Sequence, residues 1–307
     1  MTYAFVFPGQ GSQSVGMMAA YGDEAVIRDT FAEASDALGF DLAALVADGP
    51  AEALNQTINT QPAMLAAGVA VYRLWLARGG AQPALMAGHS LGEYTALACA
   101  GALGFADALK LVRLRAEAMQ SAVPEGVGAM AALLGLDDDT VRAVCAEAAQ
   151  DEVLEAVNFN SPGQVVIAGH KAAVDRGCAL AKEKGAKRAL PLPVSVPSHC
   201  ALMKPAAEKL LVALNAIEVK APRVPVIHNA DVASHSDPTA IRDALARQLY
   251  SPVRWVESMQ AMAAQGVTRI AECGPGKVLA GLNKRILDNV PTLALADAAA
   301  LAAALEQ

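Results

Sequence analysis

The residues AGHSLGEY, at positions 87–94, restrict the fold of this chain more than any other stretch. Gly88, Ser90 and Gly92 fill the pattern Gly-x-Ser-x-Gly. The apolar residues 84–87 predict a short buried strand before it, and the Ala- and Leu-rich residues 91–102 predict a buried helix after it. This order predicts a nucleophile elbow, which exposes the serine hydroxyl at a helix N-terminus. A serine that only caps the helix between two turn glycines fits the same pattern.

Strands and helices alternate on both sides of this elbow. Hydrophobic residues make up 54% of the chain and charged residues 18%, which is enough apolar surface for a large core. The predicted strands cover 3–7, 84–90, 225–229 and 267–273, and the predicted helices cover 24–38, 50–55, 61–78, 91–102, 105–121, 200–215, 238–248, 253–265, 278–287 and 296–305. The alternation predicts an α/β fold with a parallel sheet, and ligand sites in such sheets lie at the carboxyl ends of the strands.

The middle of the chain has a different order of elements. The predicted order is strand, helix, strand, strand, helix and strand, at 128–134, 138–150, 154–158, 164–168, 171–184 and 187–190. This β-α-β-β-α-β order is the ferredoxin-like pattern. Pro- and Gly-containing segments flank it, so we expect a small domain at 124–196 inserted into a large domain formed by 1–123 and 197–307.

Composition excludes several classes of protein. No run reaches the 18 or so apolar residues that span a bilayer, and residues 1–10 predict a first strand and not a signal peptide. The net charge of −7 argues against a nucleic-acid binder. The five cysteines are odd in number and lack the spacing of metal ligands, so we expect reduced thiols, no metal site and a cytoplasmic location.

One local charge run stands out, because residues 182–188 carry four positive charges and one negative charge. A solvated helix end, where the helix dipole favours cations, explains it. A docking patch for an acidic partner explains it as well.

A nucleophilic serine needs a base, and histidine is the usual base at neutral pH. The chain offers five histidines, at positions 89, 170, 199, 228 and 235. His89 is adjacent to Ser90, so its side chain should point elsewhere. His199 follows the return of the chain from the small domain, and clefts form at such boundaries. His199 is therefore the candidate base, although a lone histidine is often only structural.

Acyl transfer also needs backbone N–H donors for the oxyanion. Leu91, at the start of the helix, supplies one, and Gln10, in the Gly-flanked turn after the first strand, could supply another. The same turn could begin a dinucleotide-binding loop, but Ser14 stands where that motif requires its third glycine.

Arg115 lies in the predicted helix 105–121, with Met119 four residues on and on the same face. An arginine turned inward is costly unless it meets an anion. The alternative is an arginine whose side chain extends to the surface.

Six segments together carry a resemblance to a known family. They are FVFPGQGSQ, QPA with its following apolar helix, AGHSLGEY, NFNSPGQVVIAG, LPVSVPSHC and ECGPGKVL. In this order they resemble the malonyl-CoA–acyl carrier protein transacylases of bacterial fatty-acid synthesis, from end to end of the chain. The resemblance implies a hydrolase-like α/β domain with an inserted ferredoxin-like domain.

The resemblance also implies roles for individual residues. Ser90 matches the nucleophile, His199 its base and Arg115 the residue that binds the malonyl carboxylate. The backbone N–H groups that match Gln10 and Leu91 form the oxyanion hole. The family has no triad carboxylate, and a main-chain carbonyl near Gln248 orients the histidine.

The implied activity is a ping-pong transfer of malonyl from malonyl-CoA to the phosphopantetheine thiol of acyl carrier protein, with a malonyl-serine intermediate. No bound cofactor or metal is expected, because CoA and phosphopantetheine arrive with the substrates. Two rivals are a serine hydrolase that gives the acyl group to water and a docking subunit without chemistry. Arg115 argues against the first, because an esterase for neutral acyl groups would have no use for a buried cation. Intact Ser90, His199 and Arg115 argue against the second.

Overall fold

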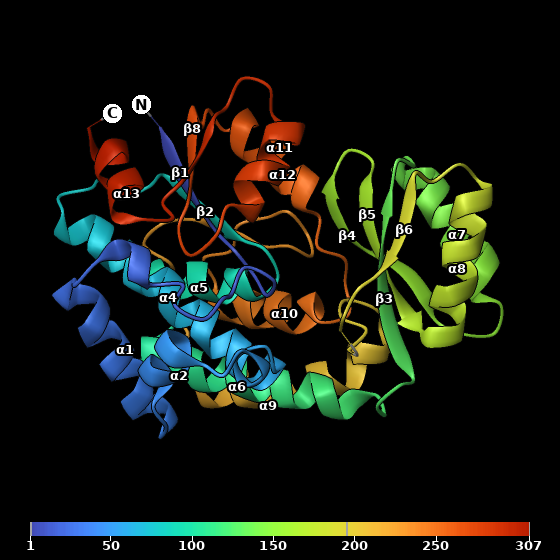
Figure 1. Cartoon of the computed structure of the whole chain (residues 1–307), viewed down its shortest axis with the longest axis horizontal. Coiled ribbons are helices and arrows are strands. Elements are labelled where there is room, and N and C mark those ends of the chain that lie inside the picture. Colours follow the sequence, from blue (N-terminus) through green and yellow to red (C-terminus); the bar gives the residue numbers. More distant parts are fainter. Residues whose placement is uncertain (1, 195, 307) are drawn as a thin grey trace.

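The computed structural model describes residues 2–194 and 196–306, and it contains two sheets. The larger sheet has the strand order β7-β2-β1-β8-β9 and the smaller one the order β4-β5-β3-β6. Figure 1 shows the two sheets in separate parts of the molecule, with the first and last strands of the chain in the same large part. The α/β fold with a second, smaller antiparallel unit is therefore confirmed.

The large sheet is parallel throughout its described pairings, and β1 lies at its centre. Its strands are β1 (Tyr3–Phe7), β2 (Leu85–Gly88), β7 (Val226–Ile227), β8 (Arg269–Glu272) and β9 (Thr292–Ala294). Side chains alternate along a strand, so β1 sends Phe5 and Phe7 into one core and Ala4 and Val6 into another. Both faces are thus covered, as parallel sheets require.

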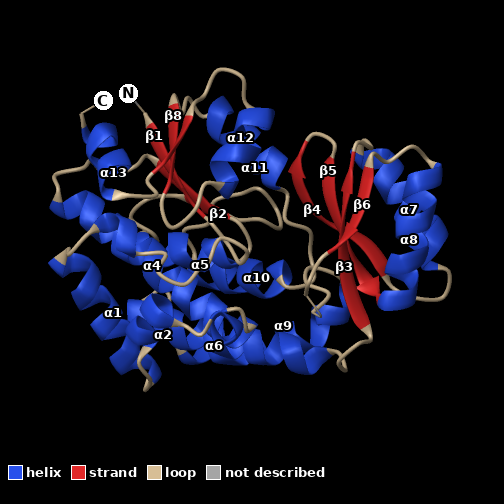
Figure 2. Ribbon diagram, in the orientation of Figure 1, coloured by secondary structure: helices blue, strands red, loops and turns tan. Residues whose placement is uncertain are grey.

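Helices supply the other half of both cores (Figure 2). The Phe5 and Phe7 face packs with α1 (Ala25–Leu38), α2 (Leu42–Asp48), α3 (Ala51–Leu54), α4 (Thr57–Ala77), α5 (Leu91–Cys99), α6 (Phe105–Ala122), α9 (Lys204–Ala216), α10 (Pro238–Gln248) and α13 (Ala298–Leu305). The opposite face packs with α11 (Trp255–Ala264) and α12 (Val278–Ile286). Helices on both faces are what an alternating strand–helix sequence predicts.

The small unit has the ferredoxin-like order predicted from the sequence. Its elements are β3 (Gly128–Leu134), α7 (Asp138–Ala149), β4 (Leu154–Ser161), β5 (Gln164–His170), α8 (Lys171–Glu183) and β6 (Arg188–Pro191). All its strand pairs are antiparallel, and α7 and α8 share a separate apolar core with the sheet. The predicted boundaries at 124 and 196 fall in connections between elements, and their placement stays a prediction.

The structure also corrects several predicted elements. The prediction missed α2 and β9, and it began α4 at position 61, whereas the helix begins at Thr57 and contains Pro62. The predicted helix 200–215 is a 3-10 turn, Ala201–Met203, followed by α9.

Candidate active site

The predicted elbow is present between β2 and α5. Ser90 has φ 52° and ψ −107°, an uncommon conformation for a residue with a side chain. A Cβ atom on Gly88 would lie 1.8 Å from the carbonyl carbon of Gly92, and one on Gly92 would lie 2.0 Å from the carbonyl oxygen of Phe7. Both motif glycines are therefore required by close backbone approach.

The Ser90 hydroxyl bonds to a histidine instead of capping its helix. Among the described residues it makes no side-chain capping bond to α5. Its Oγ lies 2.8 Å from His199 Nε2, and His199 Nδ1 lies 2.8 Å from the main-chain oxygen of Gln248. A carbonyl only accepts, so Nδ1 carries the proton and Nε2 accepts from the serine. The arrangement makes His199 ready to take the proton of Ser90.

The environment of His199 keeps it uncharged. Its side chain is buried, and burial together with the positive charge of Arg115 lowers the pKa of His199 to about 3. Both causes disfavour a positive charge on the His199 ring. At neutral pH the imidazole is therefore the free base.

Arg115 is buried next to the same serine. It is 1% exposed, so the alternative of a surface arginine is wrong. One of its terminal nitrogens donates to Gln61 Oε1 at 2.9 Å. The other donates to Ser90 Oγ at 3.2 Å and to Gln248 Oε1 at 3.1 Å, and the guanidinium lies over the Tyr94 ring.

The charge of Arg115 has no direct counter-charge in the part of the chain that the structure describes. Its hydrogen-bond partners there, Gln61, Ser90 and Gln248, are all uncharged, and its Nε atom is buried without a hydrogen-bond partner. A buried cation held only by neutral acceptors favours an anionic ligand, because burial of an unpaired charge is costly.

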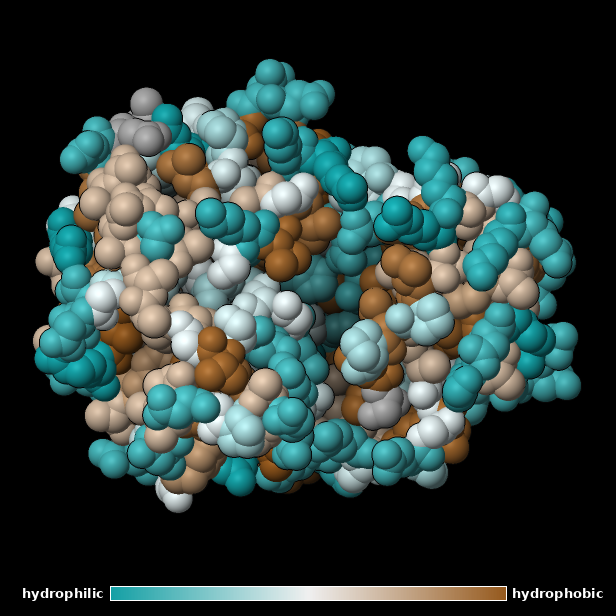
Figure 3. All heavy atoms as spheres, in the orientation of Figure 1, coloured by the Kyte–Doolittle hydropathy of each residue, from teal (hydrophilic) through white to brown (hydrophobic). Residues whose placement is uncertain are grey.

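These groups open into a cavity of about 150 Å³ between the two units. Its lining contains Gln10, Thr57, Gln61, His89, Ser90, Leu91, Arg115, Met119, Met130, Asn158, Leu192, Val194, Val196, Ser198 and His199. Six of the seven predicted site residues are in this set, and Gln248 lies buried behind His199. Figure 3 shows the molecule hollowed between the large and small parts.

The other four histidines bond elsewhere, as follows: His89 to Asn160, His170 to the backbone of Val153, His228 to Glu93, and His235 to Asp231. His89 Nε2 lies 2.8 Å from Asn160 Oδ1, and burial lowers the pKa of His89. Its ring points away from Ser90 Oγ, as predicted.

Sequence reasoning missed the polar residues that support the site. Asn229 accepts from the Ser90 N–H at 2.8 Å and donates to the Gly88 carbonyl at 2.7 Å. Gln61 donates to Met119 Sδ as well as binding Arg115. The available signals were a buried glutamine in a largely apolar helix and an asparagine just after β7, an edge strand of the parallel sheet.

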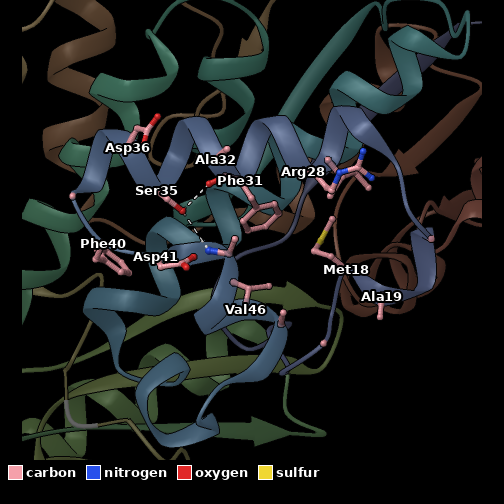
Figure 4. A pocket seen from close by; sticks show the side chains of 16 residues that line it. Met18, Ala19, Arg28, Phe31, Ala32, Ser35, Asp36, Phe40, Asp41 and Val46 are labelled. Carbon is pink, nitrogen blue, oxygen red and sulfur yellow. Dashed lines mark hydrogen bonds between the residues drawn. The ribbon is translucent and has the colours of Figure 1, made fainter.

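A cavity of about 910 Å³ lies elsewhere, between α1 and α2. In Figure 4 the Ser35 hydroxyl bonds to the helix backbone at this cavity, beside Phe31 and Val46. Its 16 described lining residues include no histidine, so this cavity offers Ser35 no histidine base.

The basic stretch 182–188 begins at the end of α8, where Lys182 lies in the last turn, as the helix-end interpretation expects. Lys187 and Arg188 line an open cavity of about 640 Å³ together with Arg285 of α12. Docking of an acidic partner at this stretch stays a prediction.

Residues 2–194 and 196–306 contain no group of three or more His, Cys, Asp and Glu side chains placed to hold a metal ion. None of the helices in these ranges combines the length and the apolar character that a membrane span needs.

Comparison with known proteins agrees with this geometry. The model of the acyl transferase domain family matches residues 4–301. The malonyl CoA-acyl carrier protein transacylase of Escherichia coli K12 is 62% identical over 99% of both chains. The acyl-carrier-protein S-malonyltransferase of Burkholderia pseudomallei 1710b has a TM-score of 0.99 and 64% identity, with 100% of both chains covered.

A third relative was solved with a partner. It is a malonyl-transacylase in complex with its type II PKS acyl-carrier protein, with a TM-score of 0.98 and 56% identity, covering 100% of this chain and 99% of that one. The family match and the full-length identity agree with the elbow, the buried arginine and the two-unit fold described above. The chain belongs to the acyl transferase domain family and, within it, to the malonyl CoA-acyl carrier protein transacylases.

Proposed function

We propose that this enzyme moves the malonyl group of malonyl-CoA to the phosphopantetheine thiol of acyl carrier protein, in fatty-acid biosynthesis. The observation that carries the proposal is the approach of His199 and Arg115 to one atom, the Oγ of Ser90. Ser90 Oγ lies 2.8 Å from the basic nitrogen of His199 and 3.2 Å from a terminal nitrogen of Arg115. A nucleophile, a base and a cation for the second carboxyl group of malonyl thus meet at one point.

In the first half-reaction Ser90 Oγ attacks the thioester carbonyl while His199 Nε2 takes the hydroxyl proton. The backbone N–H groups of Leu91 and Gln10 stabilise the oxyanion, and Leu91 is well placed because it is the first residue of α5. The C–S bond then breaks, His199 returns the proton to the sulfur, and CoA leaves. The product is malonyl-Ser90.

The second half-reaction runs the same chemistry in reverse with a different thiol. The phosphopantetheine thiol gives its proton to His199 as its sulfur attacks malonyl-Ser90. The ester C–O bond breaks, and His199 protonates the Ser90 oxygen. The Gln248 carbonyl holds the ring through Nδ1 during both steps, which is the role of the third group in a catalytic triad.

Arg115 and Met119 form the acyl pocket in this proposal. The guanidinium binds the free carboxylate of malonyl, and the apolar Met119 wall would not solvate an anion without it. We propose no bound cofactor or metal, since the CoA and phosphopantetheine groups belong to the substrates. The five cysteines are free thiols, which suits a cytoplasmic location.

Release of CoA from malonyl-CoA in the absence of carrier protein tests the proposed function. We expect a burst of free CoA equal in amount to the enzyme, followed by a plateau, because malonyl-Ser90 awaits a thiol. Addition of holo acyl carrier protein should restart release. Continuous release without carrier would instead identify a serine hydrolase.

The pH dependence of kcat/KM for malonyl-CoA provides a separate check of His199. The lowered pKa of His199 keeps the ring neutral as the pH falls through 6.5, so kcat/KM should stay level from pH 7.5 to 5.5. An acid limb centred at the ordinary histidine pKa near 6.5 would contradict this account. In Arg115→Ala, measured with acetyl-CoA, the acid limb should move to higher pH. The positive charge of Arg115, which lowers the pKa of His199, is absent from this variant.

A further inference from the structure

Glu93 is a buried carboxylate directly beneath the elbow. It is the third residue of α5 and is 0% exposed. Its Oε1 lies 2.7 Å from His228 Nδ1, and its Oε2 accepts from the Asn229 N–H and from Gln248 Nε2, each at 2.9 Å. A carboxylate only accepts hydrogen bonds, so all three of these groups donate to it.

The contact between Glu93 and Asn229 connects Glu93 to the backbone of the nucleophile. Asn229 is held by its N–H on Glu93, and its side chain bonds the chain on both sides of the elbow, at the Gly88 carbonyl and the Ser90 N–H. Ser90 has a positive φ, and such conformations persist only where surrounding contacts impose them. Glu93 therefore supports the conformation that exposes the nucleophile.

The contact between Glu93 and Gln248 connects Glu93 to Arg115 in the acyl pocket and to the base His199. Gln248 Nε2 donates to Glu93 and to the Ser90 carbonyl, which leaves Gln248 Oε1 to accept from Arg115. If the amide were reversed, its NH₂ group would face the guanidinium, donor against donor. The acceptor-only carboxylate of Glu93 thus sets the orientation of the amide.

We propose that Glu93 is a positioning residue that sets both the backbone of Ser90, through Asn229, and the guanidinium of Arg115, through Gln248. It places a negative charge one hydrogen-bonded residue away from Arg115. A direct ion pair would occupy the guanidinium, whereas this arrangement leaves it available for the carboxylate of a substrate. The part that concerns malonyl rests on the proposed function.

Glu93→Gln tests the proposal, because it keeps the shape and removes the charge and one acceptor. We expect kcat/KM for malonyl-CoA to fall about tenfold to a hundredfold, the range for one lost buried hydrogen bond to a charged group. The ratio of malonyl to acetyl transfer should fall as Arg115 loses its fixed acceptor. Acylation of Ser90 by p-nitrophenyl acetate, which has no carboxylate to bind, should slow because the elbow is loosened.

Glu272→Gln is the matched control. Glu272 is also 0% exposed, and its carboxylate accepts from the N–H groups of Leu279 and Ala280 at 3.0 and 2.8 Å, at the start of α12. The same chemical change there should leave kcat/KM and the malonyl-to-acetyl ratio within twofold of wild type. A general loss of core stability would affect both variants, and thermal unfolding of each separates it from an effect on the site.

A double variant tests the route of the effect. If Glu93 acts on selectivity through the Gln248 amide, then Glu93→Gln should lower the malonyl-to-acetyl ratio far less in a Gln248→Leu background than in the wild type. Full additivity would overturn the proposal, and so would a folded Glu93→Gln enzyme with wild-type rates and ratio. If Glu93→Gln does not fold, Glu93→Asp replaces it. Its shorter carboxylate cannot reach all three donors, and an unchanged ratio would again overturn the proposal.

The wild-type enzyme separates this inference from the proposed function. Without a stoichiometric CoA burst in the wild type, the proposed function fails. With that burst in the wild type and an unchanged Glu93→Gln variant, only the role of Glu93 fails.

Discussion

Replacement of Ser90 by alanine is expected to abolish the acyl-enzyme. Ser90 Oγ is the group that His199 Nε2 contacts at 2.8 Å, and removal of a nucleophile from such a pair lowers kcat by about 10⁴-fold or more. Intact-protein mass spectrometry after treatment with malonyl-CoA should show one malonyl adduct on the wild type and none on Ser90→Ala. Transfer to acyl carrier protein should be lost with it.

Ser198 supplies the matched control, because it is a second serine in the lining of the same cavity and adjoins the base. Ser198→Ala should still form the adduct. An adduct that persists in Ser90→Ala and disappears in Ser198→Ala would show that Ser198, and not Ser90, is the nucleophile. The protein fold should survive Ser90→Ala, because the side chain makes no capping bond to α5 within the described residues.

The elbow could be predicted from sequence because its determinants are local. Gly88 and Gly92 flank Ser90 within five residues, and the apolar segments on each side have the lengths of a strand and a helix. The order of elements in the small unit was predictable for the same reason. The start of α4 was not, because Pro62 locally favours a helix start beside it, whereas the helix begins at Thr57 and runs through Thr60, Gln61 and Pro62, which are buried in the tertiary structure.

The support beneath the elbow could not be predicted from spacing, because the topology of the sheet creates it. Glu93 is 135 residues from His228 and 155 residues from Gln248 in the sequence, yet it bonds to both. The link arises because β7 pairs with β2, which places the residues after β7 beside the start of α5. Arg115 was suspected from its apolar helix face, but Gln61 and Gln248 as its acceptors required the structure.

Arg115→Ala is expected to remove the preference for malonyl. A guanidinium grips a carboxylate with two parallel hydrogen bonds, and a hydrogen bond to a charged group contributes roughly 1.5–3 kcal/mol. The loss is greater when it leaves a charge buried, as the apolar Met119 wall would do here. We therefore expect kcat/KM for malonyl-CoA to fall about a hundredfold or more, at about 1.4 kcal/mol per factor of ten.

Acetyl-CoA provides the internal comparison, because it differs from malonyl-CoA by the carboxylate alone. Acetyl transfer should change little in Arg115→Ala, and Arg115→Lys should recover only part of malonyl transfer, because an ammonium keeps the charge without the planar fork. Arg113→Ala is the matched control, since Arg113 lies two residues away on α6 and pairs with Glu117 on the surface. Measurement of kcat/KM with both CoA esters in the wild type and the three variants decides the question. An equal loss of malonyl and acetyl transfer in Arg115→Ala would show that Arg115 supports Ser90 and Gln248 structurally and does not select the substrate.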